Sequence, residues 1–270
     1  MNFKEKYTNI VDKNNSLLCI GLDIDKDKIP KFIFDSSNNP YIDFNKSIID
    51  STKDIVCAYK LNMAFYESIG LEGHKIIKKT LEYIPKNIIT IIDGKRNDIG
   101  NSARMYAKSI YEIFNADSTT INPYLGIDGI KPFIEYKDKC NFILCRTSNP
   151  SAIEIQDQLI SNIPLYQKIS MMIKEWNYNN NCGAVIGATY PNELKIIRKI
   201  LGEDIPFLIP GIGKQGGDIE KTIKNGTNKK GLMVIINSSR NIIYAGKDEN
   251  YAEESRQAAL NTKDLINRYR

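Results

Sequence analysis

Histidine is almost absent from this sequence, because the 270 residues contain only His74. A Ser-His-Asp triad would have to use that residue, and metal sites built from several histidines are excluded. The surrounding residues 72–79 read Glu-Gly-His-Lys-Ile-Ile-Lys-Lys, which is typical of a solvent-facing helix. Acid and base chemistry therefore falls to Asp, Glu, Lys, Cys or Tyr side chains.

Long hydrophobic runs and paired cysteines are also missing. No apolar run reaches the roughly 18 residues that a membrane-spanning helix needs, and the charged start of the chain lacks the apolar segment of a signal peptide. The cysteines are odd in number and form no Cys-x-x-Cys pair; they are Cys19, Cys57, Cys140, Cys145 and Cys182. Four lie in strand-like apolar runs, so we expect buried thiols in a reducing compartment. We therefore expect a cytoplasmic protein with no membrane partner.

The charge balance is only mildly positive, since 37 basic and 32 acidic residues leave a net charge of +5. There is no basic tail and no basic stripe interleaved with aromatic residues, so nucleic acid is not an expected partner. A small positive net charge is equally compatible with binding of a small anionic ligand. The 42% hydrophobic and 26% charged residues are typical of a globular domain.

Short apolar, β-branched runs alternate with amphipathic helical patterns along the whole chain. We expect strands at residues 17–23, 55–60, 88–95, 118–122, 141–148, 183–189, 207–211 and 231–237. Helical patterns fall between them, among others at residues 99–114, 165–176, 192–201 and 253–269. Eight strands at intervals of roughly 30 residues predict a single (β/α)8 TIM barrel over residues 1–270. An open doubly wound sheet is the alternative, but no glycine-rich turn follows the first strand.

Polar residues end most of the expected strands, and in this kind of barrel the active site lies at those ends. The ends carry Asp23, Lys60, residues 93–98, residues 147–148, residues 210–217 and residues 238–240. Charged residues are common wherever a strand reaches solvent, so the charge at any single strand end needs no functional explanation. Six of them on a single rim favour a functional site.

The third strand gives the sharpest pattern. Asp93 and Lys95 are two residues apart, so strand alternation places both on one face. Asp98 follows just past the strand, and Lys60 ends the adjacent strand at the same level. Holding two aspartates and two lysines together out of water is costly unless each is paired, which favours a functional role.

Alternating lysines and aspartates can bind and then destabilise a substrate carboxylate. Two like charges about 4 Å apart repel by about 4 kcal/mol at an effective dielectric constant of about 20. Relief of this repulsion in the transition state promotes loss of CO₂, and a lysine supplies the replacing proton. A divalent metal between the aspartates is the rival, but the lysines already neutralise them.

A phosphate site is indicated at the other side of the rim. Gly211, Gly213, Gly216 and Gly217 follow the seventh strand, and Arg240 follows the eighth. The loops after these two strands form the usual phosphate site of such barrels, and arginine suits bidentate phosphate binding.

These motifs resemble those of the orotidine 5′-phosphate decarboxylases. Residues 93–103 resemble the signature D-x-K-x-x-D-I-G-N-[TS]-A of that family, and Tyr59-Lys60 resembles its second-strand lysine. Leu22-Asp23 resembles the end of its first strand. The base-binding loop, closing loop and phosphate arginine are matched, in order, by residues 147–150, 210–217 and 239–240. The chain is similar to the longer branch of the family, with its extra length near residues 25–42 and 151–163.

The resemblance implies conversion of orotidine 5′-phosphate to UMP, without a metal or cofactor, in a homodimer with shared active sites. Lys60, Asp93, Lys95 and Asp98 would form the catalytic tetrad, with Lys95 protonating C6 of the pyrimidine. The implied substrate-binding residues are Asp23, Ile99, Ser102, Ser148, Pro210, Gln215 and Arg240. Asp98, Ile99 and Ser102 would reach into the partner subunit's site.

Some residues depart from the pattern or have no role in it. Asn241 follows Arg240 where a small residue such as glycine is expected, and Tyr124, Arg146 and Lys214 lie near the expected rim without an assigned role. Two alternatives stay open. One is a metal-dependent sugar-phosphate decarboxylase or hexulose-phosphate synthase, which Lys60 disfavours because these enzymes carry an acidic metal ligand there. The other is a non-catalytic barrel that binds a nucleotide phosphate.

Overall fold

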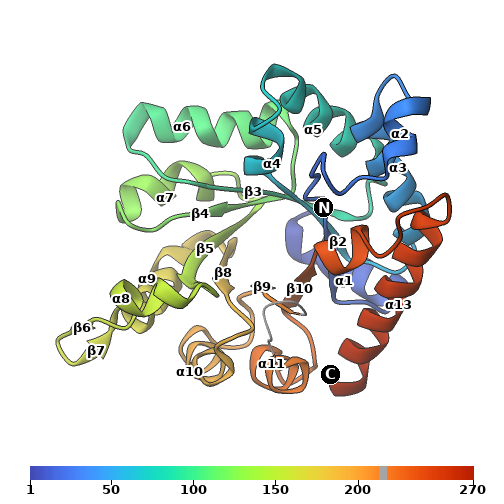
Figure 1. Ribbon diagram of the computed structural model, residues 1–270. Coiled ribbons are helices and arrows are strands. Elements are labelled where there is room, and N and C mark those ends of the chain that lie inside the picture. Colours follow the sequence, from blue (N-terminus) through green and yellow to red (C-terminus); the bar gives the residue numbers. More distant parts are fainter. Residues whose placement is uncertain (213–217) are drawn as a thin grey trace.

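Eight parallel strands close into a barrel in the computed structural model, which describes residues 1–212 and 218–270 (Figure 1). The expected (β/α)8 architecture is thereby confirmed. Around the barrel the strands follow the order β1-β10-β9-β8-β5-β4-β3-β2. Their bounds are β1 Leu18–Gly21, β2 Ala58–Asn62, β3 Ile89–Arg96, β4 Ser118–Ile121, β5 Cys140–Arg146, β8 Cys182–Ile186, β9 Phe207–Pro210 and β10 Val234–Ser238.

Helices surround the barrel and separate its strands in the sequence (Figure 1). In the first half they are α1 Phe3–Asn14, α2 Lys31–Ser36, α3 Pro40–Thr52, α4 Met63–Glu67, α5 Leu71–Tyr83, α6 Gly100–Lys108 and α7 Ile127–Ile134. In the second half they are α8 Ile153–Gln156, α9 Leu165–Trp176, α10 Pro191–Leu201, α11 Ile219–Gly226, α12 Arg240–Ile243 and α13 Tyr251–Tyr269. Shorter 3₁₀ turns occupy Pro150–Ala152 and Asn177–Asn179, and a π-helical turn at Ser109–Ile113 extends α6. None of the described helices is long and apolar enough to cross a membrane.

Helix α1 covers the end of the barrel at which the strands begin. The Tyr7 hydroxyl donates to the carbonyl oxygen of Val234, the first residue of β10, at 3.0 Å. The ring of Phe3 meets the edge of the Phe142 ring, with centroids 6.0 Å apart. Helix α1 starts with a capping box between Asn2 and Glu5, which satisfies amides of its first turn. A ligand must therefore enter from the opposite end, where the strands finish.

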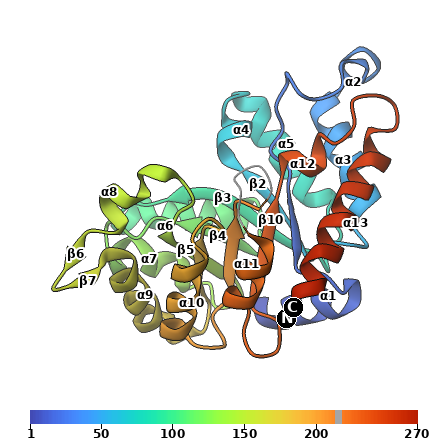
Figure 2. The same cartoon turned by 60° about the horizontal axis from the view of Figure 1, so that its bottom comes forward.

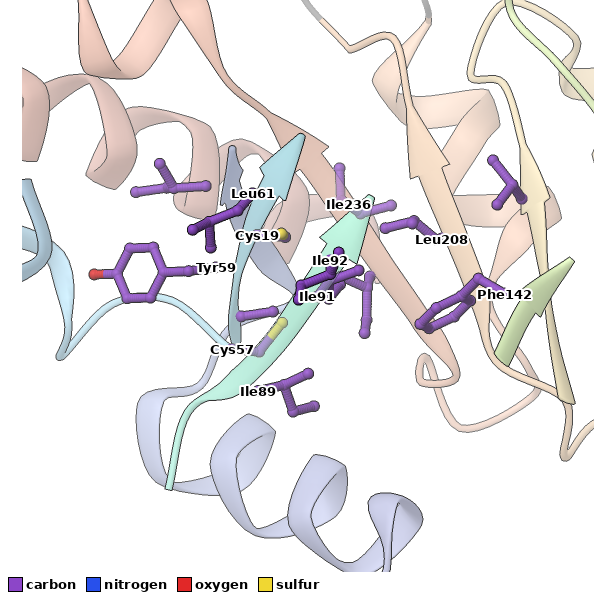
Figure 3. Close-up of a cluster of buried hydrophobic side chains, with 14 of the residues drawn as sticks. Cys19, Cys57, Tyr59, Leu61, Ile89, Ile91, Ile92, Phe142, Leu208 and Ile236 are labelled. Atoms are coloured by element: carbon purple, nitrogen blue, oxygen red, sulfur yellow. The ribbon is translucent and has the colours of Figure 1, made fainter. Parts of the chain in front are cut away.

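The lower barrel is filled by apolar side chains. Cys19, Ile91 and Leu208 come from three different strands and belong to one buried cluster (Figure 3). Tyr59 points outward instead, since its hydroxyl bonds to Thr52 and to the carbonyl of Ile49 on α3. This alternation leaves Lys60 directed inward, above a floor of buried apolar side chains.

Two features of the fold were not expected from the sequence. Strand β3 is irregular at its end, where its pairing with β4 shifts register between Ile92 and Arg96. A two-stranded hairpin, β6 Leu159–Ile160 and β7 Ile163–Pro164, projects from the barrel beside α8 (Figure 2). Its turn residues Ser161 and Asn162 both have positive φ, as a two-residue hairpin turn of the favoured twist requires.

Candidate active site

One cavity of about 430 Å³ opens at the C-terminal ends of the barrel strands. The expected site residues that line it are Asp23, Lys60, Asp93, Lys95, Ser148, Pro210 and Arg240. They come from β1, β2, β3, β5, β9 and β10 or from the loops that follow these strands. The structure thus brings together seven residues that lie far apart in the sequence, from Asp23 to Arg240.

The charged residues form a continuous row in which cations and anions alternate. Lys60 Nζ lies 3.4 Å from Asp23 Oδ1 and 3.1 Å from Asp93 Oδ2. The other carboxylate oxygen of Asp93, Oδ1, accepts a hydrogen bond from Lys95 Nζ at 2.6 Å. Lys60 and both aspartates are buried, whereas the Lys95 side chain is 46% exposed. Lys95 is therefore the cation of this row that a ligand in the cavity can reach most directly.

Electrostatics fixes the charges of Lys60 and Asp93. Burial raises the pKa of Asp93, but the ammonium groups of Lys60 and Lys95 and the hydrogen bonds from Lys95 and Thr120 outweigh burial and hold that pKa well below its usual range. For Lys60, burial lowers the pKa, and the charges of Asp23 and Asp93 more than reverse this effect. At neutral pH the cavity therefore holds an ionised carboxylate between two lysines.

The irregular end of β3 aims Lys95 at Asp93. Lys95 has φ of 47°, a left-handed backbone conformation that is uncommon for a residue with a side chain. Its backbone N–H donates to Thr120 Oγ1 at 2.9 Å, and the same hydroxyl donates to Asp93 Oδ1 at 2.8 Å. Asp93 and Lys95 both face the cavity, as strand alternation predicts, and this local irregularity together with Thr120 fixes how Lys95 approaches Asp93. Strain of this kind concentrates at functional sites.

Lys60 is lower in the barrel than the sequence indicated. Strand β2 continues to Asn62, and it is Asn62 that pairs with Asp93, while Lys60 pairs with Ile91. The expectation that Lys60 ends its strand level with Asp93 is therefore wrong. Its long side chain rises to Asp93 because the floor below it is apolar and Asp23 and Asp93 are its nearest anions.

Two tyrosines, the buried Tyr66 and the half-buried Tyr244, hold the backbone beside Asp23. The Tyr66 hydroxyl donates to the carbonyl of Leu22 at 2.7 Å, and the Tyr244 hydroxyl donates to the carbonyl of Asp23 at 2.9 Å. Tyr244 also accepts from the backbone N–H of Asp25 at 2.7 Å. Burial raises the pKa of Tyr244, so its hydroxyl keeps the proton that it donates. Asp23 lies beyond the end of β1, and these bonds replace strand pairing there.

The side of the cavity that the sequence predicts to bind a phosphate is formed by the ends of β9 and β10. Arg240 is exposed to the cavity at the start of α12, and Asn241 follows it in the same turn and lines the same space. Gly21 leaves room for this turn, because a Cβ at that position would lie 1.9 Å from Ser239 Oγ. Gln215 lies outside the described residues.

Three expected site residues lie outside the cavity of their own chain. Asp98 follows the end of β3, with Oδ1 accepting from the backbone N–H of Ile99 at 2.8 Å. Ile99 and Ser102 are exposed at the start of α6. A single chain therefore gathers three members of the expected tetrad and leaves the fourth at the surface.

Sequence reasoning missed several residues that line the cavity. Asn62 and Thr120 face inward at the ends of β2 and β4, and Asn237 does so on β10. Leu144, Val185 and Leu208 pair across β5, β8 and β9 and form an apolar wall, which is suitable for one face of a planar ring. The signal for Thr120 was present, since it is a polar residue within the expected fourth strand at residues 118–122.

The donor set does not suit a metal ion. Among residues 1–212 and 218–270, no three His, Cys, Asp or Glu side chains are grouped as ligands. The carboxylates of Asp23 and Asp93 face each other across Lys60 Nζ, and this ammonium group already supplies the positive charge that would stand between them.

A closed eight-stranded barrel with a polar cavity at the C-terminal ends of its strands defines the chain as a (β/α)8-barrel enzyme. Residues 16–255 match the model of the orotidine 5′-phosphate decarboxylase / HUMPS family, so the chain belongs to that family and is a decarboxylase of the lyase class.

Individual relatives agree with this assignment. The chain is 44% identical to orotidine 5′-phosphate decarboxylase of Dehalococcoides mccartyi over 100% of this chain and 99% of the relative. It is 43% identical to the enzyme of that name from Cellvibrio japonicus, over 99% of this chain and 98% of the relative. The solved structure of OMP decarboxylase from Leishmania donovani superposes with a TM-score of 0.87 at 31% identity and covers 100% and 98% of the two chains. The chain also matches UMP synthase of that organism with a TM-score of 0.90 at 32% identity, over 100% of this chain and 56% of the synthase.

Proposed function

We propose that this protein converts orotidine 5′-phosphate to UMP and CO₂ with its own side chains alone. The observation that carries the proposal is the row Asp23–Lys60–Asp93–Lys95, in which an ionised carboxylate stands beside an exposed ammonium group in the cavity. The names of the relatives support the substrate and its decarboxylation, and the name of the matching UMP synthase supports the product.

The substrate carboxylate would lie next to Asp93. Two carboxylates about 4 Å apart repel by about 4 kcal/mol at an effective dielectric constant of about 20, and departure of neutral CO₂ relieves that repulsion. Breaking the bond between C6 and the carboxylate leaves the electron pair on C6. The Lys95 ammonium then forms the new C6–H bond and becomes a neutral amine, which regains its proton from water. Lys60 keeps Asp93 in place and ionised throughout.

The remaining residues of the cavity would hold the parts of the nucleotide that do not react. Asp23 and Lys60 contact ribose hydroxyls, Ser148 reads the edge of the base, Pro210 covers the base, and Arg240 binds the phosphate. Gln215 would connect the base with the phosphate. Binding energy from the phosphate can be used to exclude water and align the charged groups, which raises turnover and not only affinity.

The active enzyme is proposed to be a homodimer in which Asp98, Ile99 and Ser102 complete the partner's cavity. Their position supports this, because Asp98 and Ser102 bear polar groups suited to a site, yet lie outside their own cavity. Ile99 is 56% exposed, and Met105 and Tyr106 are exposed on α6 directly after it. A second copy would cover these apolar side chains.

A direct assay tests the reaction. Purified protein is incubated with orotidine 5′-phosphate in EDTA, and loss of the orotate chromophore is followed beside Lys95→Ala. We expect rapid loss with the wild type and a fall of at least about 100-fold in the variant, because general acid catalysis contributes about that much. Wild-type activity that needs Mg²⁺, or tight UMP binding without turnover, would contradict the proposal.

A further inference from the structure

Arg146 is a buried cation for which the proposed reaction gives no reason. It is the last residue of β5 and is fully buried. Its guanidinium group lies 3.7 Å from the centroid of the Tyr190 ring and donates from Nη2 to Asp157 Oδ2 at 3.1 Å. The other terminal nitrogen, Nη1, donates to Gln156 Oε1 at 3.1 Å. Burying the charge of an arginine costs free energy unless the group is paired. These contacts pair Arg146 and fix the segment at the end of α8.

Gln156 uses both ends of its amide to hold the loop that follows β5. Its Oε1 accepts from the backbone N–H of Thr147 at 2.9 Å as well as from Arg146. Its Nε2 donates to Thr147 Oγ1 at 2.8 Å, and that hydroxyl bonds to Asn149 Oδ1 at 2.7 Å. A side-chain amide has two orientations of nearly equal shape. The Arg146 donor selects the one that directs the NH₂ group to Thr147.

The same loop is bounded on its other side by the end of β8. A Cβ on Gly187 would lie 2.7 Å from Ser148 Cα, so the two backbones are in direct contact. The Gly187 N–H donates to the carbonyl of Arg146 at 2.7 Å, and Thr189 Oγ1 lies 3.4 Å from the carbonyl oxygen of Ser148. Ser148 is therefore held against the end of β8 on one side, and its neighbour Thr147 is held by Gln156 on the other.

We propose that Gln156, oriented by Arg146, is a positioning residue that sets the recognition of the pyrimidine base. Thr147, Ser148 and Asn149 line the cavity, whereas Gln156 does not. Gln156 therefore acts only through the loop, and the part of the ligand that it influences is the part that this loop contacts. The inference rests on the proposed function, in which Ser148 reads the base, and it adds a specificity-determining residue to that function.

Comparison of two ligands isolates this role. UMP and ribose 5-phosphate share the sugar and the phosphate, and only UMP carries the base. In the Gln156→Met variant, which retains the side-chain length and removes all three hydrogen bonds, the Kd for UMP measured by titration calorimetry is expected to rise about tenfold. The Kd for ribose 5-phosphate is expected to stay the same. Gln158→Met is the matched control, since Gln158 is exposed two residues away, and both Kd values should be unchanged.

A second variant covers the case in which Gln156→Met does not fold. Gln156→Glu retains the oxygen that accepts from Arg146 and from the Thr147 N–H but removes the donor to Thr147 Oγ1. An intermediate, base-specific loss of UMP affinity is expected for it. Equal weakening of UMP and ribose 5-phosphate in either variant would overturn the inference, and so would unchanged UMP binding. Failure of the proposed function would instead show as no loss of orotidine 5′-phosphate with the wild type, so the two failures are distinguishable.

Discussion

At the scale of single residues, Asp93 is the centre of the charged row. Both of its oxygens are used, one by Lys60 and the other by Lys95 and Thr120. Such a carboxylate cannot turn away from a substrate carboxylate placed beside it. The same contacts that hold its pKa low therefore also keep its negative charge in the position where it repels the departing group.

This depressed pKa predicts a pH-dependent effect of Asp93→Asn. A lowered native pKa contributes stability above the unfolded value of about 3.9, and that contribution is lost as pH falls toward the native pKa. The free energy of unfolding of the wild type, minus that of the variant, should therefore decrease by a few kcal/mol between about pH 6 and about pH 2. Urea unfolding across this range measures it. Asp12→Asn, an exposed position on α1, should show no comparable trend; a pH-independent difference for Asp93→Asn would contradict the assignment.

At the scale of elements, the sequence predicted the strands and most of the charged site, because buried strands are apolar runs that end in polar residues. Asp23, Asp93 and Lys95 were found in this way, and α9 begins and ends where expected. The irregular end of β3 and the role of Thr120 were not predictable, since register between strands depends on contacts across the barrel. Recognition of Gln156 required knowing how α8 packs.

The loop after β1 provides a test at this scale. Tyr244→Phe removes the donor to Asp23 and leaves the Asp25 N–H without that acceptor, which should lower the free energy of unfolding by about 1 kcal/mol. Displacement of Asp23 should also lower kcat/KM for orotidine 5′-phosphate by about tenfold. Tyr178→Phe, at an exposed tyrosine, is the control for both measurements. Loss of stability with unchanged kcat/KM would show that Tyr244 has only a structural role.

At the scale of the whole molecule, the apolar core and the charged cavity occupy different levels of the barrel. Helix α1 covers one end, apolar layers fill the interior above it, and the charged row lies at the open end. The resemblance predicted Asp98, Ile99 and Ser102 as site residues, and a single chain leaves them outside its cavity. In the proposed homodimer a second copy would resolve this, and the complete site would then belong to a pair of chains.

Mixing two inactive variants tests whether Asp98 acts in the cavity of the partner subunit. If Asp98 serves the partner, a dimer of Lys95→Ala with Asp98→Ala has one fully native site, and equal mixing with subunit exchange restores about one quarter of wild-type decarboxylation. A mixture of Lys95→Ala with Lys60→Ala is the control and should stay inactive, because both lysines belong to one chain's cavity. We expect decarboxylation to recover only in the mixture of Lys95→Ala with Asp98→Ala. If neither mixture recovers while native mass spectrometry shows that subunits have exchanged, Asp98 does not act across a dimer and the account is contradicted.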